Sequence, residues 1–130
     1  MIRRSILFGA LLLTSGGPAV AQQAGAMSVA TFLAKAESLR KKGPLALMSG
    51  DLKLVTKQIQ ADGAAIRAER QAAQAAGRQP NHRPPAGGVK MTDKDILAAM
   101  QAVPAEERAR TSTKDAMRVY LARRFPCGRA

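Results

Sequence analysis

The chain offers few side chains that could carry out chemistry, and two of them, His82 and Cys127, are each the only residue of their kind. A thiol activated by a histidine is a common catalytic nucleophile. His82 lies in a proline-rich loop and Cys127 near the end of the chain, and nothing in the sequence indicates that they meet. The motifs of zinc peptidases, serine hydrolases and paired-cysteine metal sites do not occur. We therefore expect no enzymatic activity, no cofactor and no metal site.

Three other sets of residues resemble ligand sites but have simpler explanations. Asp93 and Asp95 could form an acid pair or bind a metal, but they fall in the first turn of an expected helix, where negative charge suits the helix dipole. The methionines could bind a soft metal, although methionine at helical spacing more often fills a core. Gly87, Gly88 and Lys90 resemble a phosphate-binding loop, but they lack its spacing and no strand is expected before them.

Residues 1–21 have the pattern of a secretory signal peptide. Two arginines precede an apolar run over residues 6–14, and the small residues Ala19 and Ala21 form a cleavage signal directly before Gln22. The apolar run is shorter than the roughly 20 residues that a transmembrane helix needs. No cysteine follows the small residues, which excludes a lipoprotein. We expect a periplasmic or secreted protein without a transmembrane segment in its mature chain.

The single cysteine has a particular meaning in an exported protein. Disulfide bonds form in oxidising compartments, but Cys127 has no second cysteine in the chain to pair with. A cysteine left over in an exported protein indicates either a disulfide bond to another chain or a free thiol. Both alternatives are open for Cys127.

The mature chain is small, basic and poor in large apolar side chains. The net charge is +12, of which the two arginines of the leader contribute two, and the sequence has no tryptophan and one tyrosine. Leucine, isoleucine, valine and phenylalanine together stay below roughly a fifth of the mature chain, the level at which high net charge begins to predict disorder. Alanine-rich helices can still pack closely, so the composition favours a marginal helical domain over a β fold.

Capping residues and apolar spacing predict an all-α fold, a small bundle of about four helices in a single domain over residues 28–126. A spacer (22–27) precedes this domain, a proline- and glycine-rich loop (77–90) divides it, and a short tail (127–130) follows it. The expected helices follow caps at Ser28, Ser49, Thr92 and Ser112, and end near Lys42, Ala76, Val103 and Arg124.

The long second helix has one narrow apolar stripe when it is projected at 100° per residue. The stripe consists of Leu52, Val55, Ile59, Ile66 and Ala73. Gly63 falls within it and would let another helix approach closely, so a bulky residue there should disrupt packing. Beyond Ile66 the stripe fades into an alanine-rich run, and we expect that end of the helix to project or fray.

The two later helices each have an expected inward face. On the third helix this face consists of Ile96, Leu97, Met100 and Val103. On the fourth helix Met117, Tyr120 and Leu121 should point inward, and Arg118 and Arg123 outward.

The segments MSVATFLAKAESLRKKG, DLKLVTKQI and RTSTKDAMRVYLARRFPC carry a resemblance that covers nearly the whole mature chain. They resemble a group of small exported alphaproteobacterial proteins of unknown function. This resemblance implies a cysteine in the relatives at the position of Arg83, so that Cys127 lacks a partner here. The ending RRFPC is also similar to that of periplasmic immunity proteins of the Rap and Tai type, which neutralise cell-wall amidases delivered by type VI secretion. Neither resemblance implies a catalytic residue.

These features favour a non-catalytic protein that binds another macromolecule, first of all another periplasmic protein, and an immunity role would be one such case. The alternative is a cationic envelope protein that holds lipopolysaccharide or nucleic acid through charge, with binding that falls steeply with salt. Specific DNA recognition is not expected, because the connection between the third and fourth helices is too long for a helix-turn-helix motif. Aromatic residues also do not alternate with basic ones, as stacking on single strands requires.

Overall fold

The computed structural model describes residues 26–128 and shows an all-α protein. Its helices are α1 (Val29–Lys42), η1 (Gly43–Met48), α2 (Gly50–Ala75), α3 (Asp93–Gln101), η2 (Ala105–Glu107) and α4 (Thr113–Arg124), of which η1 and η2 are 3-10 helices. The predicted small bundle of about four helices is confirmed. The expected signal peptide and its cleavage residues Ala19, Ala21 and Gln22 lie outside the described residues. Within residues 26–128, no helix has the length and apolar character that crossing a bilayer requires.

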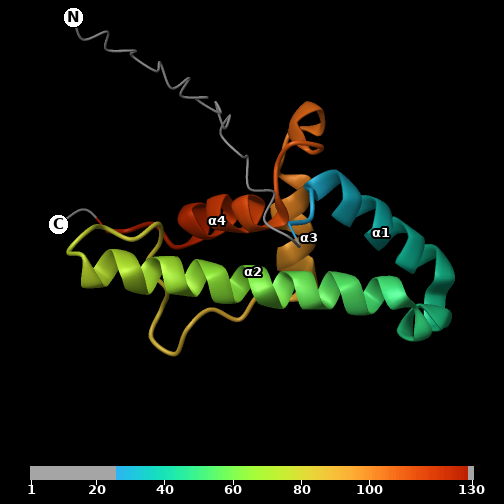
Figure 1. Cartoon of the computed structure of the whole chain (residues 1–130), viewed down its shortest axis with the longest axis horizontal. Helices are drawn as coiled ribbons and strands as arrows, with labels where there is room; N and C mark the ends of the chain where they lie inside the picture. The colour runs from blue at the N-terminus through green and yellow to red at the C-terminus, as the bar shows by residue number, and fades with distance from the viewer. Residues whose placement is uncertain (1–25, 129–130) are drawn as a thin grey trace, which may run out of the picture.

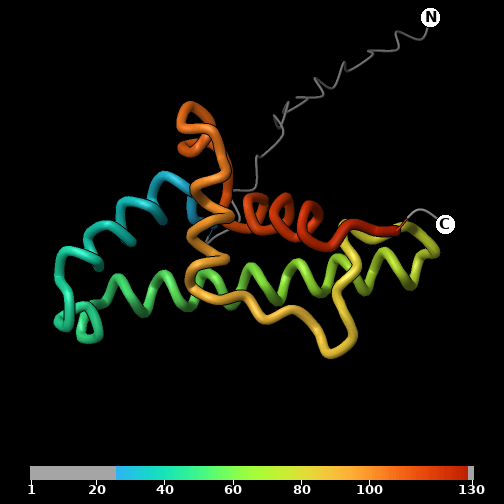
Figure 2. Tube along the Cα trace, turned by 180° about the vertical axis from the view of Figure 1, so that it is seen from behind, coloured from blue at the N-terminus to red at the C-terminus, as the bar shows by residue number. Residues whose placement is uncertain are grey.

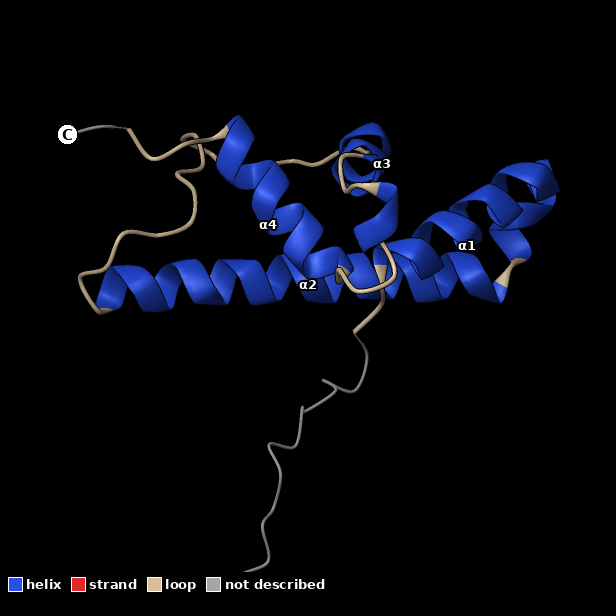
Figure 3. Ribbon diagram, turned by 90° about the horizontal axis from the view of Figure 1, so that it is seen from above, coloured by secondary structure: helices blue, strands red, loops and turns tan. Residues whose placement is uncertain are grey.

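The long helix α2 is the base on which α1, η1 and α4 pack (Figure 1). α1 lies along its N-terminal half and α4 along its C-terminal half, while α3 crosses between them and packs against both. An isolated bridge between Ser28 and Ser112 joins the starts of α1 and α4 near the middle of the molecule (Figure 3). From this point α1 and α4 diverge, so the molecule is elongated along α2.

The helices begin at the capping side chains that the sequence predicts. The hydroxyls of Ser28, Ser49 and Ser112 each accept a hydrogen bond from a backbone N–H in the first turn of the helix that follows. Thr92 and Asp95 form a reciprocal capping box at α3. Such bonds satisfy backbone groups that have no partner within a helix, which explains why the predicted starts agree with the structure.

The hydrophobic core is small and lies where the four α-helices meet. Its buried residues are Val29, Phe32, Ile66, Met100, Ala116, Met117 and Leu121. Met100 is fully buried and Met117 nearly so. Methionine is flexible enough to fill irregular gaps between helices that otherwise contribute many alanines, so the expectation that methionines serve as core residues holds for these two.

Two expectations about α2 are wrong. A Cβ atom placed on Gly63 would have no atom within 4 Å outside its own helix and neighbours, so no helix approaches closely there. The residue at the centre of the buried face is instead Asp62, which is 5% exposed. The alanine-rich end does not project, because α2 runs unbroken to Ala75 and Ala73 is buried.

The inward faces of α3 and α4 differ in part from the prediction. On α3, Leu97 is exposed, while Ala99 is buried together with the predicted Met100. On α4, Met117 and Leu121 are buried as expected. Arg118 does not point outward: it turns towards α2, where a carboxylate binds its guanidinium group.

The loop over residues 77–90 is held against the C-terminal segment, residues 125–128 (Figure 2). The backbone N–H of Arg83 donates to the carbonyl of Phe125 at 2.9 Å, and the Cys127 thiol donates to the carbonyl of Pro80 at 3.2 Å. Asn81 donates from its side chain to the Arg118 carbonyl of α4. The loop therefore closes one end of the molecule, over the C-terminal half of α2.

Candidate functional site

The structure brings together the chain segments that carry His82 and Cys127, which sequence reasoning gave no cause to associate. Cys127 is partly buried and free, and its thiol is bonded to Pro80. The His82 side chain is 1% exposed, its Nε2 lies 3.4 Å from Arg70 Nη1, and its Nδ1 has no hydrogen-bond partner in the described chain. The enclosed His82 ring and the bonded Cys127 thiol both help to hold the loop against α2 and the C-terminal segment.

The protonation of His82 follows from its surroundings. Burial first, and then the positive charge of Arg70, lower the pKa of His82 below 6.5. Because Arg70 can only donate, Nε2 accepts and the proton of the neutral ring is assigned to Nδ1. His82 is therefore neutral near pH 7 and fills the space between the loop and α2.

Asp95 does not pair with Asp93 in a metal site. Its carboxylate accepts from the backbone and hydroxyl of Thr92, from Tyr120 Oη at 2.9 Å and from Arg124 Nη1 at 2.8 Å. The backbone and side-chain bonds from Thr92, followed by that from Tyr120, lower the pKa of Asp95 to about 2. Among residues 26–128, no group of three or more histidine, cysteine or acidic side chains is placed to hold a metal ion.

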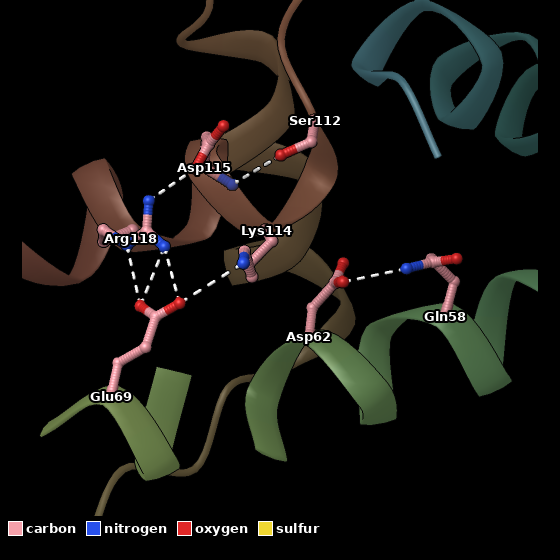
Figure 4. Close-up of polar contacts among 7 residues, drawn as sticks. All are labelled: Gln58, Asp62, Glu69, Ser112, Lys114, Asp115 and Arg118. Carbon is pink, nitrogen blue, oxygen red and sulfur yellow. Dashed lines mark hydrogen bonds and ion pairs between the residues drawn. The ribbon is translucent and has the colours of Figure 1, made fainter. Parts of the chain in front are cut away.

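The contact between α2 and α4 contains a line of polar side chains, which we call the polar seam (Figure 4). At its inner end Asp62 accepts from the Thr113 hydroxyl and from Gln58 at 2.8 Å. At its outer end Glu69 binds Arg118 at 2.8 Å and Lys114 at 3.2 Å. Burial raises the pKa of Glu69, but bonds from both basic side chains outweigh it and lower that pKa overall.

Sequence reasoning missed the polar seam although the chain contains a signal for it. At 100° per residue, Asp62 and Glu69 project onto the same stripe as Val55, Ile66 and Ala73. Acidic residues on an apolar stripe need partners on the facing element. The seam orients α4 on α2, and its groups are occupied by one another, so it serves the fold.

The most exposed apolar side chains gather at the opposite end of the molecule from the loop. Leu45, Leu47 and Met48 on η1 are 69%, 78% and 87% exposed, and Leu54 on α2 is 54% exposed. We call these four residues the apolar tip. They lie where α1 turns back into α2, at the end of the helical hairpin (Figure 1). Large exposed apolar patches on protein surfaces are often interaction sites, so we treat the apolar tip as the candidate site.

Local sequence explains why the apolar tip projects. Gly43 ends α1 with a positive φ of 55°, and Pro44 starts η1 with the backbone angle that a helix start favours. The chain needs η1 to reverse direction, and no other element of the described chain packs against it except α1 and α2. Pro44 is a local signal for the helical turn, but no local signal gives the outward direction of its apolar residues.

Basic side chains flank the apolar tip in the sequence, and they lie at the end of α1 and near the start of α2. This basic rim comprises Arg40, Lys41, Lys42, Lys53 and Lys57, all exposed. The nearby carboxylates are engaged, Glu37 with Arg40 and Lys41, and Asp51 with Lys35 at 2.8 Å. The hydrogen bond from Arg40 lowers the pKa of Glu37, and that from Lys35 lowers the pKa of Asp51. Lys53 and Lys57 have no acidic partner in the described chain, so the end of the hairpin is apolar and positively charged.

A second surface feature is a hollow of about 340 Å³ between α3, η2 and α4. Its walls include Val103, Val119 and Tyr120. Its charged residues are Glu107 of η2, which is half-buried, and Asp115 and Arg123 of α4, which are exposed. The hollow contains no cluster of buried reactive groups in the described chain, and the apolar tip is the stronger candidate.

Comparisons of the chain with protein-family models, with curated proteins and with solved structures find no match.

Proposed function

We propose that the protein is an exported, non-catalytic binding protein that docks on a component of the cell envelope through the apolar tip and the basic rim. The observation that carries the proposal is the exposure of Leu45, Leu47 and Met48 at one end of the molecule. Transferring such side chains from water to an apolar partner is favourable by up to about 1.5–3 kcal/mol for each one fully buried. The hydrophobic core is small, and leaving these apolar side chains in water adds nothing to its stability. A binding role explains why they are exposed.

The placement of the reactive side chains supports a binding role. His82 is enclosed against Arg70, the Cys127 thiol is bonded to a backbone carbonyl, and Asp95 caps α3. Each group has a structural task, and the apolar tip lies at the far end of α2 from His82 and Cys127 (Figure 2).

The proposal is tested by retention of the chain beginning at Gln22 on envelope preparations that contain both membranes and their proteins. The variant Leu47→Ser with Met48→Ser should be retained less than the wild type. Val119→Ser is the matched control, because Val119 is 50% exposed on α4, away from the tip. Equal retention of the tip variant and the wild type would refute docking through the tip.

A second candidate function is binding of an anionic polymer through charge alone. It is favoured by exposed basic residues outside the rim that make no ion pair with an acidic residue among residues 26–128. These residues are Arg67, Arg78, Arg83, Lys90, Lys94 and Arg123. This function predicts that retention falls steeply as salt increases and is equal for the tip variant and the wild type.

A further inference from the structure

We infer that the apolar tip inserts into the surface of a bilayer that contains anionic phospholipids. This inference rests on the proposed function, since it names the partner of the same surface. It depends on three observations: the tip projects from one end of the molecule, its backbone is internally hydrogen bonded, and its surroundings are positively charged.

The shape of the tip suits a soft partner. The exposed apolar side chains belong to η1 and the start of α2, at the end of a helical hairpin (Figure 1), and within the described chain η1 packs only on the two helices that it joins. Side chains at such an end can all enter a fluid layer at once, to the depth of about 5–10 Å at which interfacial helices lie. A folded protein partner would need a matching cavity.

The backbone of the tip is prepared for a poorly hydrated environment. Unsatisfied N–H and C=O groups are strongly unfavourable in a bilayer. Here Gly43 bonds back to the Arg40 carbonyl, Ser49 N–H bonds to the Ala46 carbonyl at 3.0 Å, and Pro44 has no N–H to satisfy. These bonds satisfy part of the backbone of the turn, which reduces the number of unpaired polar groups that the tip brings into the interface.

The charge around the tip selects anionic headgroups. Glu37 and Asp51 are both bound by basic side chains, which leaves the excess charge of the rim positive. Long lysine and arginine side chains can keep their charged ends at headgroup level while the apolar residues insert more deeply. Each basic residue near an anionic surface favours binding roughly fivefold.

The absence of tryptophan from the sequence allows a direct test. Met48→Trp places a single fluorophore at the most exposed residue of the tip, and Val119→Trp places one on α4. With vesicles of phosphatidylcholine and phosphatidylglycerol in equal parts, emission from Met48→Trp should shift to the blue and be quenched by brominated lipid chains. Emission from Val119→Trp should not change. A lack of shift at position 48, or equal shifts at both positions, would overturn insertion of the tip.

Vesicle partitioning separates the apolar and charged contributions. Leu47→Ser with Met48→Ser should lower the partition coefficient on the order of a hundredfold. Lys53→Ser with Lys57→Ser should lower it roughly 25-fold on anionic vesicles and hardly at all on pure phosphatidylcholine. The control Arg78→Ser with Arg83→Ser makes the same change of charge on the distant loop and should have a much smaller effect. Equal effects of the two charge variants would overturn the assigned orientation.

Further outcomes distinguish this inference from the proposed function. If retention on envelopes depends on the tip but the wild type does not bind anionic vesicles, the partner is an envelope protein and the lipid inference fails alone. If the Met48→Trp shift occurs with lipopolysaccharide but not with phosphatidylglycerol vesicles, the phospholipid assignment fails. If neither envelopes nor vesicles distinguish the tip variant from the wild type, both fail.

Discussion

Asp62 is a carboxylate at 5% exposure in the middle of an apolar helix face, and it is retained there by two partners. The Thr113 hydroxyl, itself fully buried, and the Gln58 amide both donate to it. A buried polar group that loses its partner is destabilising by about 1–3 kcal/mol. A single substitution at the inner end of the polar seam should therefore lower the free energy of unfolding strongly.

We expect Asp62→Ala to lower the free energy of unfolding by about 1–3 kcal/mol, because it leaves the Thr113 hydroxyl buried without its acceptor. The matched control is Glu106→Ala, an exposed acidic residue of η2 that should change stability by about 0.5 kcal/mol or less. Urea unfolding followed by circular dichroism measures both. Adding Thr113→Val to Asp62→Ala should recover part of the loss, and purely additive losses would show that the two side chains do not interact.

His82 makes stability depend on pH in a range where no carboxylate contributes. Its pKa is lowered in the folded protein, so the unfolded chain binds more protons as the pH falls through 6.5. Stability from the neutral ring is fully present above that value and is lost as the pH falls towards the lower pKa of the folded state. The carboxylates with lowered pKa values, such as Asp95 and Glu69, lose their contribution only at lower pH, from ordinary values of 3.8 and 4.5 downwards.

The free energy of unfolding should therefore decrease between about pH 7.5 and about pH 5.5 in the wild type. His82→Gln should remove most of this decrease, whatever its stability at the higher pH, because the chain has no other histidine. His82→Phe provides a second variant without a titrating ring. An equal decrease in the wild type and both variants would show that His82 is not the responsible group.

At the scale of the helices, sequence predicts boundaries well because capping is local. Ser28, Thr92 and Ser112 each act within their own first turn, so four residues contain the information that starts the helix. The faces of the helices are less predictable, since they depend on the neighbour. Asp62 was not counted on the buried stripe, because its partner Thr113 lies 51 residues away.

The candidate site was predictable only in its parts. The sequence shows the basic cluster at the end of α1 and the turn that begins at Pro44, and it suggests a solvated helix end. Whether Leu45, Leu47 and Met48 pack or project depends on how closely the other helices approach η1. That distance is a property of the tertiary structure, which includes the bridge between Ser28 and Ser112 at the opposite end of α1, and no local pattern encodes it.

Gly63 provides the test of packing at this scale. With open space around its Cβ position and no positive φ, alanine fits there. Gly63→Ala should raise the free energy of unfolding by about 0.5–1 kcal/mol, because glycine is the less favourable residue within a helix. Gly43→Ala is the contrasting variant and should be destabilising, since its φ of 55° strains any side chain. A loss of thermal stability in Gly63→Ala would instead support the expectation from the sequence that another helix approaches closely at Gly63.

At the scale of the whole molecule, the two ends of α2 have different tasks. One end carries the exposed apolar tip, and the other is covered by the loop over residues 77–90 and the C-terminal segment, which encloses His82. The alanine-rich half of α2 has little apolar surface of its own, so its order depends on these covering contacts and on the ion pairs of Glu69.

A chain that ends at Arg124 should therefore loosen one end of the molecule and leave the other unchanged. It lacks the Phe125 carbonyl that accepts from Arg83 and the thiol that donates to Pro80. Amide hydrogen exchange should become faster over residues 67–75 and 81–83, because local opening then breaks fewer contacts. The amides of α1 and of the first half of α2 should exchange as in the full chain. Cys127→Ser is the control that keeps the backbone pairing, and it should show much smaller changes than the truncation. Faster exchange throughout α2 would instead mean that the C-terminal segment supports the whole fold, and the two ends would not be independent.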